Sequence, residues 1–169
     1  MQPNAGNQRT EFRRVVVPEE LELLREIDQK IFSRFPADLF SDEEWAEFES
    51  HWMIVDGKII GCSAFLRDTD FNNEPRPGCL HIMTTGILPD FRRQGFGAKL
   101  KQWQIEYAKQ HGFRMIVTNT RESNHAMIQL NLKLGFVIRG SAPHFYIEPD
   151  EPAIVMELQL DAGPSTSLS

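Results

Sequence analysis

One junction near the middle of the chain constrains its fold more than any other feature: a strand pattern runs through a glycine-rich turn into a helix pattern. The apolar residues from 79 to 88 predict a strand that Pro89 ends. A helix over residues 95–110 follows, with apolar residues at helical spacing: Phe96, Leu100, Trp103 and Tyr107. Gly95 and Gly97 allow backbone N–H groups to surround an anion at the positive end of this helix. The junction therefore predicts an α/β chain with an anion-binding loop.

Strand and helix patterns alternate through the rest of the chain. Helices are predicted from Glu19 to before Pro36, after the capping box of Ser41 and Glu44, and over residues 124–134. Strands are predicted over residues 12–17, 52–55, 58–66, 113–118, from 136 to 139 and onward, and over 153–160, with a hairpin turn at 56–57 and a loop over 68–78. A mixed sheet with helices on both faces satisfies the order β-α-α-β-β-β-α-β-α-β-β.

The length and composition fit one globular domain. The chain has 169 residues, 41% of them hydrophobic and 25% charged, and shows no internal repeat or linker. We expect a single domain over residues 11–160, a flexible start over 1–10 and a disordered tail over 161–169, which is small and polar.

Charge and cysteine content exclude several classes of protein. A net charge of −6 and a pI near 5.4 argue against a nucleic-acid partner held by a broad basic surface. The acidic surface favours cationic ligands or serves solubility alone. Cys62 and Cys79 lack the spacing of a disulfide framework or a zinc site, so no metal is expected. The polar start and the broken apolar runs predict a cytoplasmic protein with no membrane partner. Both a monomer and a homodimer are compatible with the sequence.

The glycine-rich turn has the form Arg-x-x-Gly-x-Gly and carries three nearby cations: Arg92, Arg93 and Lys99. Such charges suit a pyrophosphate or a 3′-phosphate, although an ordinary solvated helix start has the same appearance. The turn lacks the Gly-Lys-Ser/Thr ending of a Walker A loop and the Gly-x-Gly-x-x-Gly of dinucleotide folds. A nucleotide-binding domain of another kind would need an acidic metal or ribose ligand, and no such motif spacing is present.

A second motif follows the first in order: an Asn-led helix that begins at Asn124 and ends in Leu134-Gly135-Phe136. Together the two motifs make residues 80–158 resemble the core of GNAT acetyltransferases, and the first half resembles the lead-in of the same family. The resemblance implies a GNAT fold, with a central mixed, mostly antiparallel sheet of about seven strands and splayed fourth and fifth strands.

The resemblance also implies a set of coenzyme A contacts. Backbone amides of the turn would hold the pyrophosphate, the strand backbone around Ile87 would pair with the pantetheine arm, and Asn124 would bind further along that arm unless it only caps its helix. Asn131 lies where many members carry a tyrosine. The expected acetyl-CoA-binding residues are Ile87, Arg92, Arg93, Gln94, Gly95, Phe96, Gly97, Ala98, Asn124 and Asn131.

The catalytic positions depart from the common family pattern. Asn131 cannot protonate the leaving thiolate as a tyrosine would, and Tyr146 is the substitute acid or a packed aromatic residue. Asn119 stands where ribosomal-protein acetyltransferases carry a glutamate. His81 stands at the position of the histone-type base and is predicted to accept a proton from an ammonium, the alternative being a buried core histidine; His125 and His144 are weaker candidates.

The acceptor is expected between loops 34–40 and 142–151, with contacts from Phe35, Asp38, Asn119 and His144. Glu148, Asp150 and Glu151 are further acidic candidates for holding a cation. The segment 144–156 is similar to the ending of protein N-terminal acetyltransferases. The predicted function is transfer of an acetyl group from acetyl-CoA to a primary amine, either a small molecule or a peptide N-terminus, by direct attack in a ternary complex. The alternative is a non-catalytic module that binds acyl-CoA.

Overall fold

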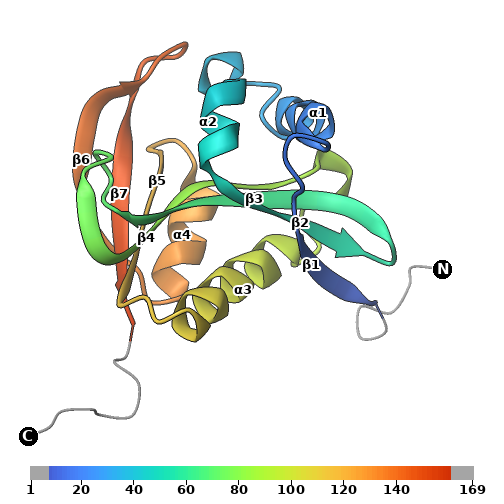
Figure 1. Ribbon diagram of the computed structural model, residues 1–169. Helices are drawn as coiled ribbons and strands as arrows, with labels where there is room; N and C mark the ends of the chain where they lie inside the picture. The colour runs from blue at the N-terminus through green and yellow to red at the C-terminus, as the bar shows by residue number, and fades with distance from the viewer. Residues whose placement is uncertain (1–7, 161–169) are drawn as a thin grey trace, which may run out of the picture. The chain divides into compact units, whose positions relative to one another are not determined.

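The computed structural model describes residues 8–160, so the predictions for residues 1–7 and for the tail 161–169 lie outside the described residues. Seven strands, four α-helices and two short 3-10 helices follow one another in the predicted order (Figure 1). The strands are β1 Thr10–Arg14, β2 Glu49–Val55, β3 Lys58–Thr69, β4 Pro75–Ile87, β5 Met115–Arg121, β6 Val137–Tyr146 and β7 Glu151–Gln159. The helices are α1 Leu21–Ile31, η2 Pro36–Asp38, α2 Asp42–Glu47, η3 Pro89–Phe91, α3 Phe96–Gln110 and α4 His125–Lys133.

The seven strands form a mixed sheet in the order β1-β2-β3-β4-β5-β7-β6, which confirms the predicted sheet. Strands β1 and β2, β2 and β3, β5 and β7, and β6 and β7 pair antiparallel, whereas β4 and β5 pair parallel. The parallel register runs from Cys79↔Met115 to Ile82↔Thr118, and both strands continue beyond it, β4 to Ile87 and β5 to Arg121.

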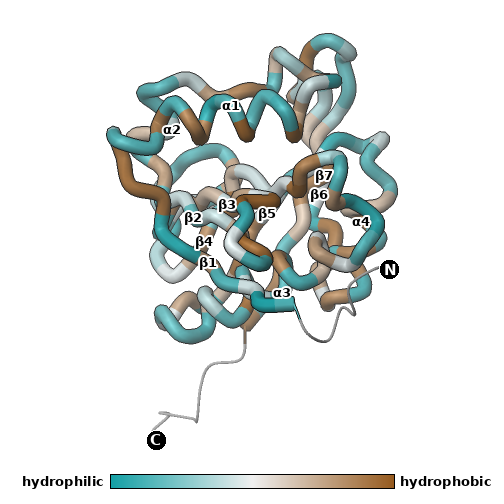
Figure 2. The backbone as a smooth tube through the Cα atoms, turned by 90° about the vertical axis from the view of Figure 1, so that its right-hand side faces the viewer, coloured by the Kyte–Doolittle hydropathy of each residue, from teal (hydrophilic) through white to brown (hydrophobic). Residues whose placement is uncertain are grey.

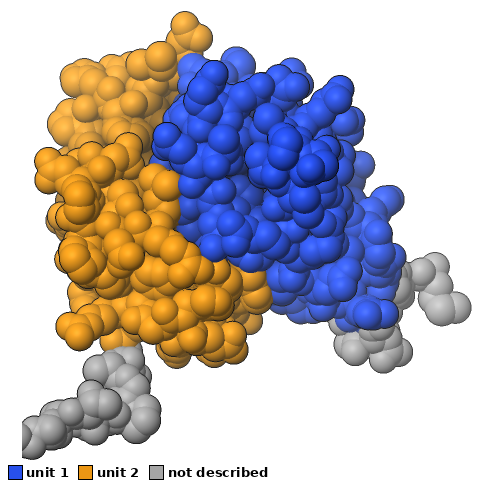
Figure 3. Space-filling model, viewed as in Figure 1, with its two compact units in different colours: residues 1–65, 83–100 blue, residues 66–82, 101–169 orange. Residues whose placement is uncertain are grey.

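The described chain divides into two compact units (Figure 3). Unit 1 holds residues 8–65 and 83–100, and unit 2 holds residues 66–82 and 101–160. Strands β3 and β4 and helix α3 each contribute residues to both units. The single domain expected over residues 11–160 stays a prediction.

In unit 1, amphipathic helices bury their apolar faces. Helix α1 buries Leu24, Ile27 and Ile31, and Figure 2 shows hydrophobic segments recurring along α1 and α2. The predicted capping box is present, because Ser41 and Glu44 exchange side-chain-to-backbone hydrogen bonds at the start of α2. Trp45 of α2 is fully buried and packs edge to face against two phenyl rings, those of Phe40 and Phe48.

The first strand differs from the prediction. It covers Thr10–Arg14 rather than residues 12–17, so the last of the residues expected to be loose already belongs to the sheet. Val16 and Val17 are 49% and 37% exposed, despite the strand preference of valine. The carboxylate of Glu20 accepts the Val16 N–H, and the Glu20 N–H donates to the Val16 carbonyl. These two bonds turn the chain towards α1 and end the strand.

In unit 2, the strands are longer than predicted. The loop expected over residues 68–78 shrinks to 70–74, because β3 extends to Thr69 and β4 begins at Pro75. Strand β5 begins and ends later than the predicted 113–118. Strand β6 runs to Tyr146, which pairs with Glu151 of β7, so Tyr146 ends a strand and does not lie in a loop. Cross-strand pairing, which the local pattern does not encode, sets these limits.

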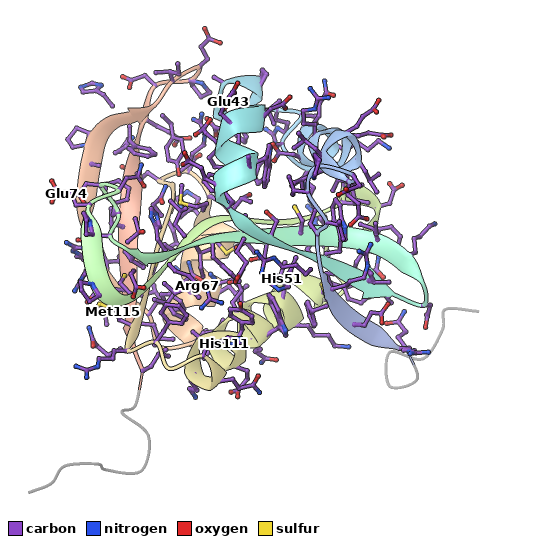
Figure 4. All side chains as sticks on the ribbon, viewed as in Figure 1. Glu43, His51, Arg67, Glu74, His111 and Met115 are labelled. Atoms are coloured by element: carbon purple, nitrogen blue, oxygen red, sulfur yellow. The ribbon has the colours of Figure 1, made fainter. Side chains whose placement is uncertain are left out.

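In unit 2, polar and charged side chains contact aromatic rings. The Tyr107 hydroxyl accepts a hydrogen bond of 2.8 Å from Arg67, and the Tyr107 ring stacks on His111 at 3.9 Å. Arg67 and His111 are labelled in Figure 4. Lys101 of α3 is 1% exposed, with its ammonium 4.9 Å from the centre of the Phe136 ring, and burial lowers its pKa to about 7.

Residues 8–160 contain neither a membrane-spanning helix nor a metal-binding cluster of side chains. No helix there is long and apolar enough to cross a membrane. Within the same part of the chain, no group of three or more His, Cys, Asp or Glu side chains could hold a metal ion.

Candidate active site

The glycine-rich turn in unit 1 forms a loop between two helices of different kinds. The short helix η3 ends at Phe91, and α3 begins at Phe96. Between them the backbone adopts left-handed torsions at Arg93 and Gly95, with φ of 62° and 85°. The first N–H groups of a helix have no intrahelical acceptor, so the amides of the first turn of α3 point out of the loop as donors.

The space outside this loop is open. A Cβ built at Gly95 or Gly97 meets no atom within 4 Å. Gly97 has no left-handed torsion, so only Gly95 needs the conformational freedom of glycine. Beside the loop lies a hollow of about 430 Å³, lined by Gln8, Val55, Asp56, Lys58, Phe91, Gln94 and Phe96. These features suit an anionic ligand that approaches the loop backbone.

Arg92 has a structural role that the sequence did not reveal. Its guanidinium donates to the carbonyl of Ile87 at 3.0 Å and to the carbonyl of Ile31, the last residue of α1, at 2.7 Å. A cation at a helix C-terminus is favourable. The side chain therefore ties the loop to α1 and to the end of β4, within the stretch of strand backbone predicted to pair with the pantetheine arm.

Helix α1 approaches β4 so closely that one glycine is required. A Cβ on Gly86 would lie 2.4 Å from Cγ2 of Ile31, closer than real Cβ contacts. Gly86 was not among the predicted site residues, because a glycine within a strand pattern does not show which helix will pack on it.

The loop predicted to contact the acceptor contains Phe35 and the helix η2, which ends at Asp38; both residues are partly buried. A buried carboxyl fixes this loop: Asp28 of α1, 2% exposed, accepts the backbone N–H of Phe40. Burial raises the pKa of Asp28 to about 7, and the Phe40 hydrogen bond opposes this rise.

Unit 2 brings three of the predicted site residues together. His81 of β4 lies with Nε2 3.5 Å from Oδ1 of Asn119 on β5. The Asn119 amide donates to the Tyr146 hydroxyl at 2.8 Å. Asn119 therefore links the candidate base to the candidate acid, across strands β4, β5 and β6.

The His81 imidazole is 2% exposed. Burial lowers its pKa, whereas the hydrogen bond to Asn119 and the neighbouring Asp70 act in the opposite direction. The neutral ring is therefore the favoured form near neutral pH, and a neutral imidazole can accept a proton.

Arg121, at the end of β5, was not predicted as a site residue. It is 5% exposed and donates to the carbonyls of Ile147 and Pro149 and to the carboxylate of Glu151. Its guanidinium also lies 4.6 Å from the centre of the Tyr146 ring. Arg121 thus clamps the β6–β7 hairpin behind Tyr146, a role that no local sequence pattern indicates.

The acidic residues of this hairpin divide into two groups. Glu151 binds Arg121 and both the N–H and the hydroxyl of Ser123, so it belongs to the clamp. Asp150 is exposed and accepts from Nδ1 of His144 at 2.8 Å. Glu148 is exposed at the turn, where its φ is 52°.

The two asparagines of α4 lie in different environments. Asn124 caps the helix, because its Oδ1 accepts the Met127 N–H at 3.2 Å. Asn131 is 1% exposed, and its amide donates to the sulfur of Met156 at 3.7 Å. Asn131 is therefore out of contact with solvent.

Comparison with known proteins identifies the family. A model described as the acetyltransferase (GNAT) family matches residues 19–136, well over half of the chain. The chain belongs to the GNAT family. It is an acetyl-CoA-dependent N-acetyltransferase. The match contains the glycine-rich loop, His81 and Asn119, whereas Tyr146 and the β6–β7 hairpin follow it.

Two curated relatives of this GNAT chain are acetyltransferases by name. The Drosophila melanogaster protein "Probable N-acetyltransferase san" is 24% identical over 160 residues, which cover 90% of this chain and 83% of the fly protein. The N-alpha-acetyltransferase 50 of Danio rerio is 27% identical over 150 residues, which cover 84% of each protein.

Solved structures confirm the GNAT fold. The ribosomal-protein-S18-alanine N-acetyltransferase from Escherichia coli has a TM-score of 0.77 at 19% identity, over 95% of this chain and 100% of that chain. A GNAT family acetyltransferase from Elizabethkingia anophelis with acetyl-CoA bound has a TM-score of 0.70 at 17% identity, over 89% and 98%.

Proposed function

We propose that this GNAT enzyme transfers the acetyl group of acetyl-CoA to the α-amino group at a protein N-terminus, by direct attack in a ternary complex. The hydrogen-bonded chain of His81, Asn119 and Tyr146 is the observation that carries this proposal. Relatives named for N-alpha and ribosomal-protein alanine acetylation support the choice of acceptor.

The turn in unit 1 fits the phosphate end of the coenzyme. The first amides of α3 and the open space at Gly95 and Gly97 would hold the pyrophosphate, and the exposed Arg93 would add charge. Asn124 and the backbone of β4 near Ile87 remain the proposed contacts of the pantetheine arm. The coenzyme supplies an acetyl group activated as a thioester.

The chain's own residues handle the protons. As the amine nitrogen bonds to the carbonyl carbon and the carbon–sulfur bond breaks, one amine proton passes to His81, directly or through water. Tyr146 donates a proton to the departing thiolate. That donation is a small contribution, because a thiol of pKa about 8.5 is already a tolerable leaving group.

Because His81 is a weak base, it favours an acceptor amine that is already partly neutral. An α-amino group of pKa about 8 is roughly one-tenth neutral at pH 7, whereas a lysine side chain of pKa about 10.4 is less than a thousandth neutral. A neutral histidine therefore suits the α-amine. Phe35, Asp38, Asn119 and the exposed His144 are the proposed acceptor contacts. Glu151 is not proposed, because it binds Arg121.

An acceptor screen tests the proposal. Turnover of acetyl-CoA is measured with peptides that carry a free N-terminus, with the same peptides blocked at the N-terminus but containing lysine, and with polyamines. We expect turnover with free N-termini, and initial-rate lines that intersect when both substrates are varied. Turnover confined to lysine or polyamines would contradict the acceptor class, and parallel initial-rate lines would contradict the ternary complex.

A further inference from the structure

One residue of the β3–β4 turn packs on the face of the sheet on which His81 lies. By register, His81 shares this face of unit 2 with Val117, Asn119 and Val155. The ring of Phe71, in the turn between Thr69 and Pro75, packs on the apolar part of this face, made of Cys79, Met115, Val117 and Val155. Figure 4 shows Glu74 at the turn and Met115 on β5.

Phe71 lies beside His81 and contacts Phe145, which packs on Tyr146. Its ring centre lies 6.4 Å from that of His81 and 5.1 Å from that of Phe145, the residue before Tyr146. Phe145 in turn packs edge to face on Tyr146 at 4.9 Å. A single side chain of the turn therefore lies beside the candidate base and is linked to the candidate acid.

Asp70 holds the turn in this position. Its carboxylate accepts the Phe71 N–H at 2.8 Å and two bonds from Arg139 of β6, at 2.6 and 3.1 Å. It also pairs with Arg76 of β4, and both arginines contact Glu157 of β7. The pKa of Asp70 is held well below its usual range, mainly by the hydrogen bond from Arg139. This network of ion pairs connects the turn to β4, β6 and β7; Figure 1 shows where these strands lie.

We propose that Phe71 is a positioning residue that covers His81 and shields its imidazole from bulk solvent, and that the ion pairs of Asp70 fasten this cover. Burial is the main cause of the lowered pKa of His81, so removal of the cover should raise it. The charged groups on this face are Asp70, Arg76, Arg139 and Glu157, and among them Asp70 acts on His81. On the β5 and β6 sides His81 meets the uncharged Asn119, which Tyr146 contacts in turn.

The cover has a consequence for catalysis, which rests on the proposed function. A covered His81 stays neutral to lower pH and remains able to accept a proton there. Loss of the cover should therefore reduce kcat/KM below pH 7 more than above it.

Titration of His81 by NMR tests the cover without any turnover. The His81 ring signal is assigned by its loss in His81→Gln, and its pKa is compared in wild type, Phe71→Ala and the apolar control Phe71→Leu. We expect Phe71→Ala to raise the pKa of His81 by about half a unit or more and Phe71→Leu to change it far less. Unchanged His111 signals show that the fold is intact. An unchanged pKa in a folded Phe71→Ala protein would overturn the proposal.

The variant Asp70→Asn distinguishes the fastening role of Asp70 from the effect of its negative charge. The two effects change the pKa of His81 in opposite directions. Loss of the carboxylate charge alone lowers the pKa of His81, whereas release of the cover raises it. We expect a rise; a fall would overturn the fastening role of Asp70. If the pKa of His81 rises in these variants but the acid limb of the rate profile does not follow, the cover is real and the assignment of His81 as the base is wrong.

Discussion

His81 is an imidazole that burial keeps neutral, and Asn119 connects it to Tyr146. At the scale of residues, these three hydrogen-bonded side chains carry out the chemistry proposed for the enzyme. A base must be neutral to act, so the rate should rise with pH through the pKa of His81 and again through the pKa of the acceptor amine, about 8 for an α-amino group.

Substitution of His81 is the direct residue-scale prediction. His81→Ala should lower kcat by about a hundredfold, the contribution of a general base, and shift the pH–rate profile to higher pH. Tyr146→Phe should slow turnover only modestly. The control is His125→Ala, because His125 is exposed at the start of α4. This variant should keep the wild-type kcat. A near-normal kcat for His81→Ala from pH 6 to 9 would make His81 structural.

At the scale of elements, the conformation of the loop before α3 depends on the left-handed torsion of Gly95. The β6–β7 hairpin depends on the buried side chain of Arg121. Gly95 has a left-handed torsion, whereas Gly97 has helical geometry with open space around it. The two glycines therefore have different requirements, although the motif presents them as a pair.

Substitutions in the loop should separate folding from coenzyme binding. Gly95→Ala should reduce the free energy of unfolding by about 1–2 kcal/mol, because an L residue is strained at this torsion. Gly97→Val should leave the protein folded and abolish acetyl-CoA binding, by blocking access to the loop backbone, with Gly97→Ala as the milder control. Thermal unfolding and calorimetric titration measure the two effects. Unchanged affinity in Gly97→Val would refute the pyrophosphate assignment.

The Arg121 clamp predicts a large loss of stability. Arg121→Met removes a cation that is 5% exposed and leaves the Glu151 carboxylate without its main partner. Breaking a buried ion pair from one side costs about 3–5 kcal/mol. Lys30→Met, which breaks an exposed pair with Glu26, is the control and should cost less than about 1 kcal/mol. Equal losses in urea denaturation would show that the clamp is no stronger than a surface pair.

At the scale of the whole molecule, two buried ionisable groups should change the free energy of unfolding with pH in opposite directions. Asp28 has its pKa raised to about 7, so between pH 4 and 7 the folded protein binds a proton that the unfolded chain has lost, and stability falls as pH rises. Lys101 has its pKa lowered to about 7, so between pH 7 and 10 the unfolded chain binds the extra proton and stability rises with pH.

Urea denaturation across pH 4–10 tests these slopes. Asp28→Asn, which keeps an oxygen for the Phe40 N–H, should remove the fall below pH 7. Lys101→Met should remove the rise above pH 7 and stabilise the protein at pH 6 by a few kcal/mol, on the order of the linkage energy of a buried lysine. Lys30→Met, at an exposed site, should leave both slopes in place. Wild-type slopes in the two core variants would contradict these assignments.

The sequence alone determined the elements that local rules encode. The Ser41 capping box, the turn at Asp56 and Gly57, and the helix that follows Gly95 are each specified by neighbouring residues, and all three are present. The two motifs also sufficed for the family, because they lie in one continuous order along the chain.

Tertiary structure alone decided the strand limits and the partners of the charged side chains. Val16 and Val17 lie outside the first strand because hydrogen bonds with Glu20 turn the chain there. Tyr146 belongs to β6 because it pairs with Glu151 of β7. Several charged side chains bind partners that lie up to 69 residues away in the sequence; these are Arg92, Arg121 and Asp70. Local patterns describe which face a residue presents, but a hydrogen bond or an ion pair depends on distance in space, and only the folded chain brings such residues within reach.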